Sequence, residues 1–137
     1  MDWITESIAI GTYLDAQDGD LLKQFGIRSV LGLVSTLAGI APDQLGLERI
    51  EIVPLIDGPG NDRRVFLRAV DTLEELVREA APVLVHCHAG RARAPVVVAG
   101  FLMKTLGLDA DPALERVRAR RDISPEPALS ALLDHLG

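Results

Sequence analysis

Short apolar runs recur along the chain and predict the strands of a sheet. Four segments have this pattern: 7–11, 28–34, 49–55 and 83–85. The segment 28–34, with the sequence RSVLGLV, is apolar enough to be a buried strand. The segment 49–55 contains Pro54, which has no N–H for a sheet ladder, so this strand should end near the edge or terminus of the sheet.

The segments between these runs have apolar residues at helical spacing. The clearest one begins at Asn61 or Asp62, either of which could cap it, and continues to about Ala80. Further helices are expected at 15–25, 92–106, 109–121 and 125–136, with a short helix or turn at 41–47. Strands that alternate with helices predict an α/β fold, with a central, mostly parallel sheet of four to five strands flanked by helices.

Composition and charge narrow the range of functions. The length of 137 residues suits one domain over 1–137, and a hydrophobic content of 48% with only 4% aromatics predicts an aliphatic core. The net charge of −6 argues against a general binder of nucleic acids or anionic membranes, because phosphates would be repelled on average. Any phosphate site must therefore be local.

The number of cysteines limits the disulfide and metal chemistry of the chain, and its first residues bear on its cellular compartment. A single cysteine, Cys87, excludes an internal disulfide, a C-x-x-C redox pair and a four-cysteine zinc site. No signal peptide is visible, and the longest apolar run, 95–103, is far shorter than the roughly 20 residues of a membrane span. We expect a soluble, cytoplasmic protein that is a monomer.

The segment VLVHCHAGRARAP is the strongest candidate for a chemical site. It predicts a strand, a short glycine-containing loop and a helix, and ligands of parallel sheets bind beyond such strand ends. Backbone N–H groups in the loop and at the helix start favour an anion and should stabilise the thiolate of Cys87. Arg93, six residues later, can grip two oxygens of a phosphate. Together these groups predict phosphoryl transfer without a metal.

Two other interpretations of this segment stay open. A Cys followed six residues later by Arg is weak evidence by itself, since only Lys23 and Lys104 of the 14 basic residues are lysines. A lone cysteine after an apolar strand is usually an inert core residue. A zinc site of His86, Cys87 and His88 would need a further ligand, and the chain has no other cysteine.

The motif HCHAGRAR resembles the His-Cys-x-Ala-Gly-x-x-Arg signature of the cysteine-dependent protein tyrosine and dual-specificity phosphatases. The resemblance includes the opening segment 7–34 and the closing segment ARRDISPEPALSALL. It implies that Cys87 and Arg93 are catalytic and that His86 orients the loop. It also implies that phosphate is bound by the rest of the loop, namely His88, Ala89, Gly90, Arg91 and Ala92. No cofactor and no metal are implied.

The resemblance further implies a general acid on a loop upstream of the cysteine. Asp57 matches it, because it follows the strand-like 49–55 and opens a Gly/Pro loop 30 positions before Cys87. Expulsion of an alkoxide or phenoxide from phosphorus needs such a proton donor. The alternative is that Asp57 has no catalytic role and only forms a turn before Gly58. Asp62 is the second candidate, although its position suits a helix cap better.

The chain departs from the family pattern at three places. Ala94 stands where the family usually has Ser or Thr, whose hydroxyl would assist departure of the thiolate, so slower breakdown of the intermediate is expected and a phosphate-binding pseudoenzyme is an alternative. Glu126 stands where the family often has Asn. His88 and Arg91 occupy places where phosphoinositide phosphatases carry basic residues, although the favoured interpretation is that Arg91 simply faces solvent or an acidic neighbour.

The sequence thus predicts a phosphomonoesterase that acts through a phosphocysteine intermediate. Phosphotyrosine in proteins or peptides is the expected substrate, with phosphoserine and phosphothreonine next, and phosphoinositides or other polyphosphorylated molecules are the alternative. A rhodanese-like sulfurtransferase also uses a loop cysteine, but Asp57 and Arg93 favour phosphate. Low-molecular-weight tyrosine phosphatases and thiol arsenate reductases place the cysteine near the N-terminus, whereas Cys87 is late. A non-catalytic phosphate-binding module is the remaining alternative.

Overall fold

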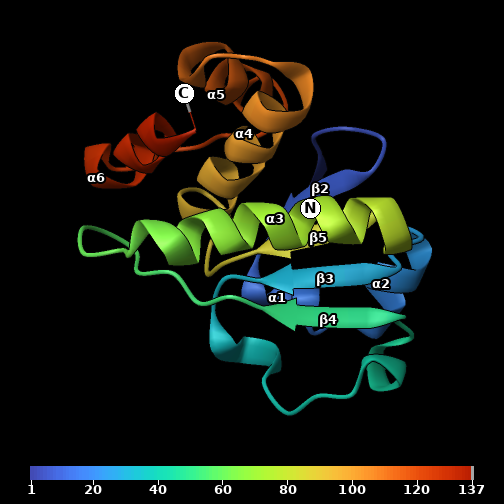
Figure 1. The fold of residues 1–137 in the computed structure, drawn as a ribbon. Helices are drawn as coiled ribbons and strands as arrows, with labels where there is room; N and C mark the ends of the chain where they lie inside the picture. Colours follow the sequence, from blue (N-terminus) through green and yellow to red (C-terminus); the bar gives the residue numbers. More distant parts are fainter. Residues whose placement is uncertain (137) are drawn as a thin grey trace.

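The computed structural model describes residues 1–136 and has a five-stranded sheet at its centre (Figure 1). The strand order is β1-β2-β5-β3-β4. β1 pairs antiparallel with β2, and all other neighbours are parallel, so the predicted mostly parallel sheet of four to five strands is confirmed. The strands are β1 Asp2–Trp3, β2 Ile8–Gly11, β3 Ser29–Gly32, β4 Arg49–Ile52 and β5 Val83–His86.

The helices fall mostly where apolar periodicity predicts them. They are α1 Tyr13–Ala16, α2 Gly19–Gln24, α3 Arg63–Ala80, α4 Arg93–Leu106, α5 Ala110–Arg118 and α6 Pro127–Ser130, with 3-10 turns at Ser35–Leu37, Pro42–Leu45 and Ala131–His135. Asp62 caps α3, since its carboxylate accepts the Arg64 N–H at 2.7 Å. This is the capping role that the sequence favours for Asp62.

The single helix expected at 15–25 is wrong. Thr12 and Asp15 form a capping box that begins α1, and the Asp18 side chain then accepts the Leu21 N–H at 3.1 Å and begins α2. Side chains of this kind compete with the backbone for its N–H groups, so they start a new helix rather than continue the old one.

The sheet lies between two apolar layers. Figure 1 shows α3 crossing the front of the sheet with α1 and α2 behind it. Residues of β2 and β5 alternate between the layers: Ile8, Ile10 and Val85 join the core under α3 and α4, whereas Ala9 and Leu84 join the core under α1 and α2. This alternation follows from the two-residue period of a strand and gives the aliphatic core that the composition predicts.

The topology brings the carboxyl ends of the parallel strands to one edge. His86, the last residue of β5, lies between Gly11 of β2 and Gly32 of β3. Beyond β4, the N–H groups of Val53 and Leu55 still donate to β3 and its continuation, on either side of the N–H-less Pro54. The loops after β4 and β5 therefore open on the same edge. No helix among residues 1–136 is long and apolar enough to span a bilayer.

Candidate active site

The residues 87–92, here called the 87–92 loop, connect β5 to α4. The helix begins at Arg93 without a side-chain cap, since Ala92 at the N-cap has no suitable group. The first N–H groups of a helix have no partner inside the helix, and the helix dipole places partial positive charge there. This end of α4 is therefore suited to an anion, with backbone donors rather than side chains supplying the first contacts.

Cys87 lies on a pocket of about 260 Å³ at this edge of the sheet. Its thiol is free and its residue is only 2% exposed. The pocket is lined by Asp57, Cys87, His88, Ala89, Arg91, Ala92, Arg93, Ser124 and Glu126. Most residues that the sequence selects are thus brought to one hollow, from segments 30 or more positions apart.

Arg93 connects the loop to the segment that carries the acid candidate. Its guanidinium is buried, donates from Nη1 to the Leu55 carbonyl at 3.3 Å, and has Nη2 4.0 Å from the Asp57 carboxylate. Its Nε is buried and has no hydrogen-bond partner among residues 1–136. A buried donor without a partner is costly, and a guanidinium that lines a pocket is suited to bind an oxyanion.

Asp57 is held at the pocket by Asn61. The Asn61 side chain accepts the Ile56 N–H at 2.8 Å and donates to the carbonyls of Ile56 and Gly58 at 2.8 and 3.2 Å. The Asp57 carboxylate is 57% exposed, which places it at the mouth of the pocket rather than at its floor. A proton donor at that position can reach the leaving group of a bound phosphoester.

His86 is fully buried beside the cysteine and does not line the pocket. Burial lowers the pKa of His86 below its ordinary 6.5 because desolvation disfavours the imidazolium; the Arg93 charge lowers it further, and a bond to the Cys87 carbonyl opposes both. Its Nδ1 lies 3.1 Å from that carbonyl, which can only accept, so Nδ1 carries the proton. His86 thus holds the first peptide of the loop.

His88 and Arg91 extend the pocket outward. The His88 ring stacks on Tyr13 with centroids 4.5 Å apart. The Arg91 guanidinium lies 3.6 Å from the Asp122 carboxylate and is more than half exposed. Arg91 therefore lines the pocket and also pairs with an acidic neighbour, as the non-functional interpretation of this residue expected.

The structure also places three residues that sequence reasoning did not select. Ser124 and Glu126 line the pocket, and the Ser124 N–H donates to the Arg91 carbonyl at 2.8 Å. Arg121 donates to two carbonyls of the 87–92 loop without lining the pocket. All three belong to the segment 119–133, which the family resemblance includes, and this was the sequence signal that could have identified them. Gly90, selected as a phosphate binder, does not line the pocket, and its φ is +69°.

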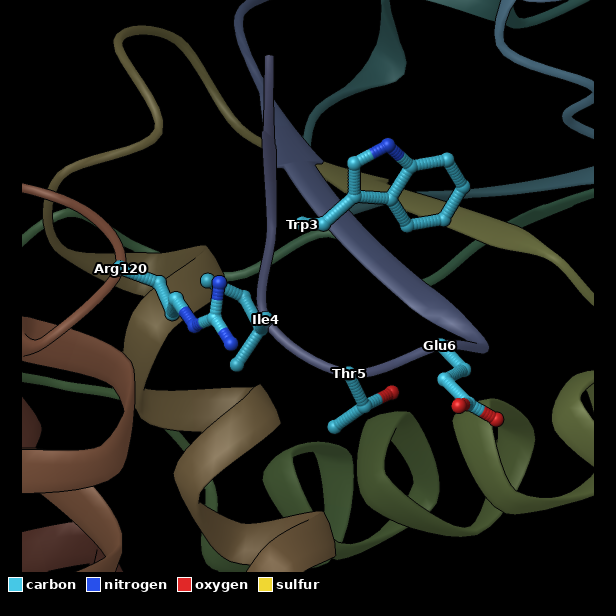
Figure 2. Close-up of a pocket in the computed structure, with 5 residues that line it drawn as sticks. All are labelled: Trp3, Ile4, Thr5, Glu6 and Arg120. Carbon is cyan, nitrogen blue, oxygen red and sulfur yellow. The ribbon is translucent and has the colours of Figure 1, made fainter.

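A larger hollow of about 550 Å³ lies elsewhere, around the turn between β1 and β2 (Figure 2). It is lined by Trp3, Ile4, Thr5, Glu6 and Arg120. Its polar side chains are those of Trp3, Thr5, Glu6 and Arg120, and no cysteine lines it. Among the described residues, no three His, Cys, Asp or Glu side chains gather as a metal site. The pocket at Cys87 is therefore the candidate active site.

Comparison with known families gives an extended match. The family described as "Dual specificity phosphatase, catalytic domain" matches residues 8–135. Among curated relatives, dual specificity protein phosphatase 1 of Arabidopsis thaliana is 28% identical over 121 residues, covering 88% of this chain and 60% of the relative. Dual specificity protein phosphatase 1B of the same plant is 32% identical over 119 residues, covering 86% of this chain and 70% of the relative.

Solved structures show the same architecture. A mouse putative dual specificity phosphatase complexed with zinc tungstate has a TM-score of 0.84 at 26% identity, covering 98% of this chain and 84% of that chain. A human tyrosine phosphatase-like serine/threonine/tyrosine-interacting protein has a TM-score of 0.82 at 25% identity, covering 98% and 93%. Both likenesses extend over 98% of this chain.

Proposed function

This chain belongs to the dual specificity phosphatase catalytic-domain family, a family of phosphoric monoester hydrolases, and from that premise we propose that it removes phosphate from phosphotyrosine in proteins or peptides. Phosphoserine and phosphothreonine are the next substrates in this proposal. The whole of 1–137 acts as one catalytic domain, and the reaction proceeds through a phosphocysteine.

The first half of the reaction forms the phosphocysteine. The Cys87 thiolate attacks phosphorus, so that a sulfur–phosphorus bond forms as the bond to the leaving oxygen breaks. Asp57 donates its proton to that oxygen. Arg93 and the N–H groups of the 87–92 loop hold the other phosphate oxygens, whose charge they stabilise in the transition state.

The second half releases phosphate. Water attacks the phosphorus of the phosphocysteine, the Asp57 carboxylate accepts the proton of that water, and the sulfur–phosphorus bond breaks. The Cys87 thiolate and inorganic phosphate are the products, and Asp57 is again protonated. His86 stays neutral throughout, because burial disfavours its charged form, and it serves to orient the loop.

One observation carries the proposal: Arg93, whose buried Nε has no hydrogen-bond partner among residues 1–136, lines the same small pocket as the buried Cys87. An inert core cysteine needs no neighbouring guanidinium, and a sulfurtransferase needs no acid beside it. The tungstate named for the mouse structure is an oxyanion with the tetrahedral shape of phosphate, so it is a suitable probe for this chain as well.

The test is a substrate panel of phosphotyrosine and phosphothreonine peptides, an inositol phosphate and a nucleotide. Wild type should act on phosphotyrosine most rapidly, whereas Cys87→Ser should lose turnover and keep tungstate binding. Turnover by Cys87→Ser near the wild-type rate would refute the assigned nucleophile. Hydrolysis of the inositol phosphate alone would refute the protein substrate.

Two observations bear on the alternatives. Ala94, fully buried in the first turn of α4, favours slow breakdown of phosphocysteine, so a phosphate-binding module with little turnover is the second candidate. A polyphosphorylated substrate is less favoured. Asp122 already pairs with Arg91, and Glu126 adds negative charge to the pocket lining, where a second phosphate would be repelled.

A further inference from the structure

Arg121 is the most heavily hydrogen-bonded side chain near the 87–92 loop. Its Nε donates to the Gly90 carbonyl at 2.7 Å and its Nη2 to the Ala89 carbonyl at 3.0 Å. Its Nη1 donates to the Asp2 carboxylate at 2.8 Å and to the Ile10 carbonyl at 3.3 Å. The side chain is only 12% exposed. A planar guanidinium suits such a fork of contacts, and a lysine would not.

These contacts fix the direction of two peptide units. In a trans peptide the carbonyl and the N–H of the next residue point in opposite directions. When Arg121 holds the carbonyls of Ala89 and Gly90, the N–H groups of Gly90 and Arg91 must point away from Arg121. Neither of these N–H groups donates to a main-chain carbonyl among the described residues.

We propose that Arg121 is a positioning residue that turns the N–H groups of Gly90 and Arg91 toward the bound phosphate, with Asp2 of β1 as its ionic anchor. This inference rests on the anion site proposed above. Arg121 itself does not line the pocket and acts only through the loop. The N-terminal strand and the segment after α5 thus share in ordering the site.

Tight packing around Gly90 restricts the loop to this arrangement. A Cβ at Gly90 would lie 2.6 Å from the Gly11 carbonyl oxygen and 2.7 Å from Arg121 Nη2. The loop is therefore close to β2 on one side and to the guanidinium on the other. Without Arg121, two loop carbonyls would lose their donors, and their peptides would be free to rotate.

The test measures tungstate affinity by calorimetry in a Cys87→Ser background, where no turnover occurs. Arg121→Met should weaken binding at least about tenfold, because hydrogen bonds from a charged donor are lost and the loop donors are misdirected. Arg120→Met is the matched control: this exposed neighbour lines the hollow of Figure 2 and should leave affinity within about twofold. Circular dichroism confirms folding at the temperature of measurement.

Two results would overturn the inference. The first is an Arg121→Met protein that binds tungstate as tightly as its parent, since a merely structural role lowers the unfolding midpoint and leaves the affinity of the folded protein unchanged. The second is an Arg120→Met protein that loses as much affinity as Arg121→Met, since charge alone would then explain the loss.

If Arg121→Met fails to fold, Asp2→Asn decides the question. It removes the ionic anchor of Arg121 from a half-exposed position and should weaken tungstate binding about two- to fivefold. Unchanged affinity would overturn the inference. Binding is measured without turnover, so a wild-type chain that hydrolyses no phosphoester would refute the proposed function and not this role of Arg121.

Discussion

Gly90→Ala should damage the site more than an otherwise similar substitution at Gly107. Both glycines have left-handed φ values, +69° and +68°. The surroundings differ: a Cβ at Gly90 would lie 2.6 Å from the Gly11 carbonyl oxygen, whereas a Cβ at Gly107 would meet nothing within 4 Å. The pair therefore separates the cost of a close approach from the cost of backbone conformation.

The expected magnitudes follow from these distances. A left-handed conformation costs an alanine about 1–2 kcal/mol, and reduced freedom of the unfolded chain returns about 0.4–1 kcal/mol of this. Gly107→Ala should therefore lower the free energy of unfolding by about 1 kcal/mol. Gly90→Ala adds the cost of overpacking against the backbone of Gly11, about 1–3 kcal/mol more.

Urea denaturation and tungstate binding together measure the outcome. Gly107→Ala should bind tungstate like wild type, because it changes only the far end of α4. Gly90→Ala should lose at least about tenfold in affinity, since the loop must move to relieve the contact. Equal losses of stability and affinity in the two variants would show that the approach of Gly90 to β2 does not constrain the loop.

Four further outcomes are expected. The lowered pKa of His86 means that the unfolded chain binds its proton more readily, so the free energy of unfolding should fall as pH drops below 6.5, by up to about 1.4 kcal/mol per unit. His86→Asn should flatten this slope between about pH 6.5 and 5.5 in denaturation curves, and an unchanged slope would assign it to another group. Asn61→Ala removes the hydrogen bonds that hold residues 56–61, the loop that carries Asp57 and is here called the acid loop. It should lower kcat about 10- to 100-fold for poor leaving groups and less for an aryl phosphate, and equal losses would count against the role of the acid loop. Ala94→Ser should raise turnover and shrink a pre-steady-state burst, and no change would show that phosphocysteine hydrolysis was never limiting. Peroxide should inactivate the enzyme without an internal disulfide in this chain, since Cys87 is its only cysteine, and activity that survives oxidation of the thiol would contradict the mechanism.

The parts of the fold that follow from local pattern were predictable from the sequence. Apolar runs and helical periodicity give four of the five strands and the long helices α3 and α4. β1 was missed because two residues carry no periodic signal. The expected helix at 15–25 failed because capping by Asp18 competes locally with helix propagation, and the apolar spacing of the segment does not report that competition.

Some residues of the candidate site were likewise predictable from local sequence pattern, and others were not. Cys87 and Arg93 belong to one continuous segment, so the strand, the glycine-containing loop and the helix start around them were enough to predict that they share one pocket. Asn61 was considered as a helix cap, yet the neighbouring Asp62 caps α3 and Asn61 holds the acid loop. Two adjacent residues with similar capping preference cannot be assigned their partners from sequence alone.

The contacts of Arg121 could not be predicted from the sequence, for a physical reason. It is 31 positions from Gly90 and 119 from Asp2, and it follows other arginines at the end of a segment with helical periodicity. The sequence predicts a helix to 121, whereas α5 ends at Arg118, so the chain leaves the helix just before the residue that reaches the loop. Only the folded chain brings β1, β2 and this segment together.

The 87–92 loop is thus connected to distant parts of the chain by two arginines with different tasks. Arg93 lines the pocket and reaches back 38 positions to the Leu55 carbonyl, which brings the acid loop to the phosphate site. Arg121 holds carbonyls of the same loop from outside the pocket and is anchored by the N-terminal strand. Since an anion site made of backbone N–H groups has no side chains of its own to define it, its precision depends on whatever fixes the peptide planes. In this small chain those fixing contacts are long-range, so we expect the proposed anion site to form only after β1 has joined the sheet and the segment after α5 has packed against the 87–92 loop.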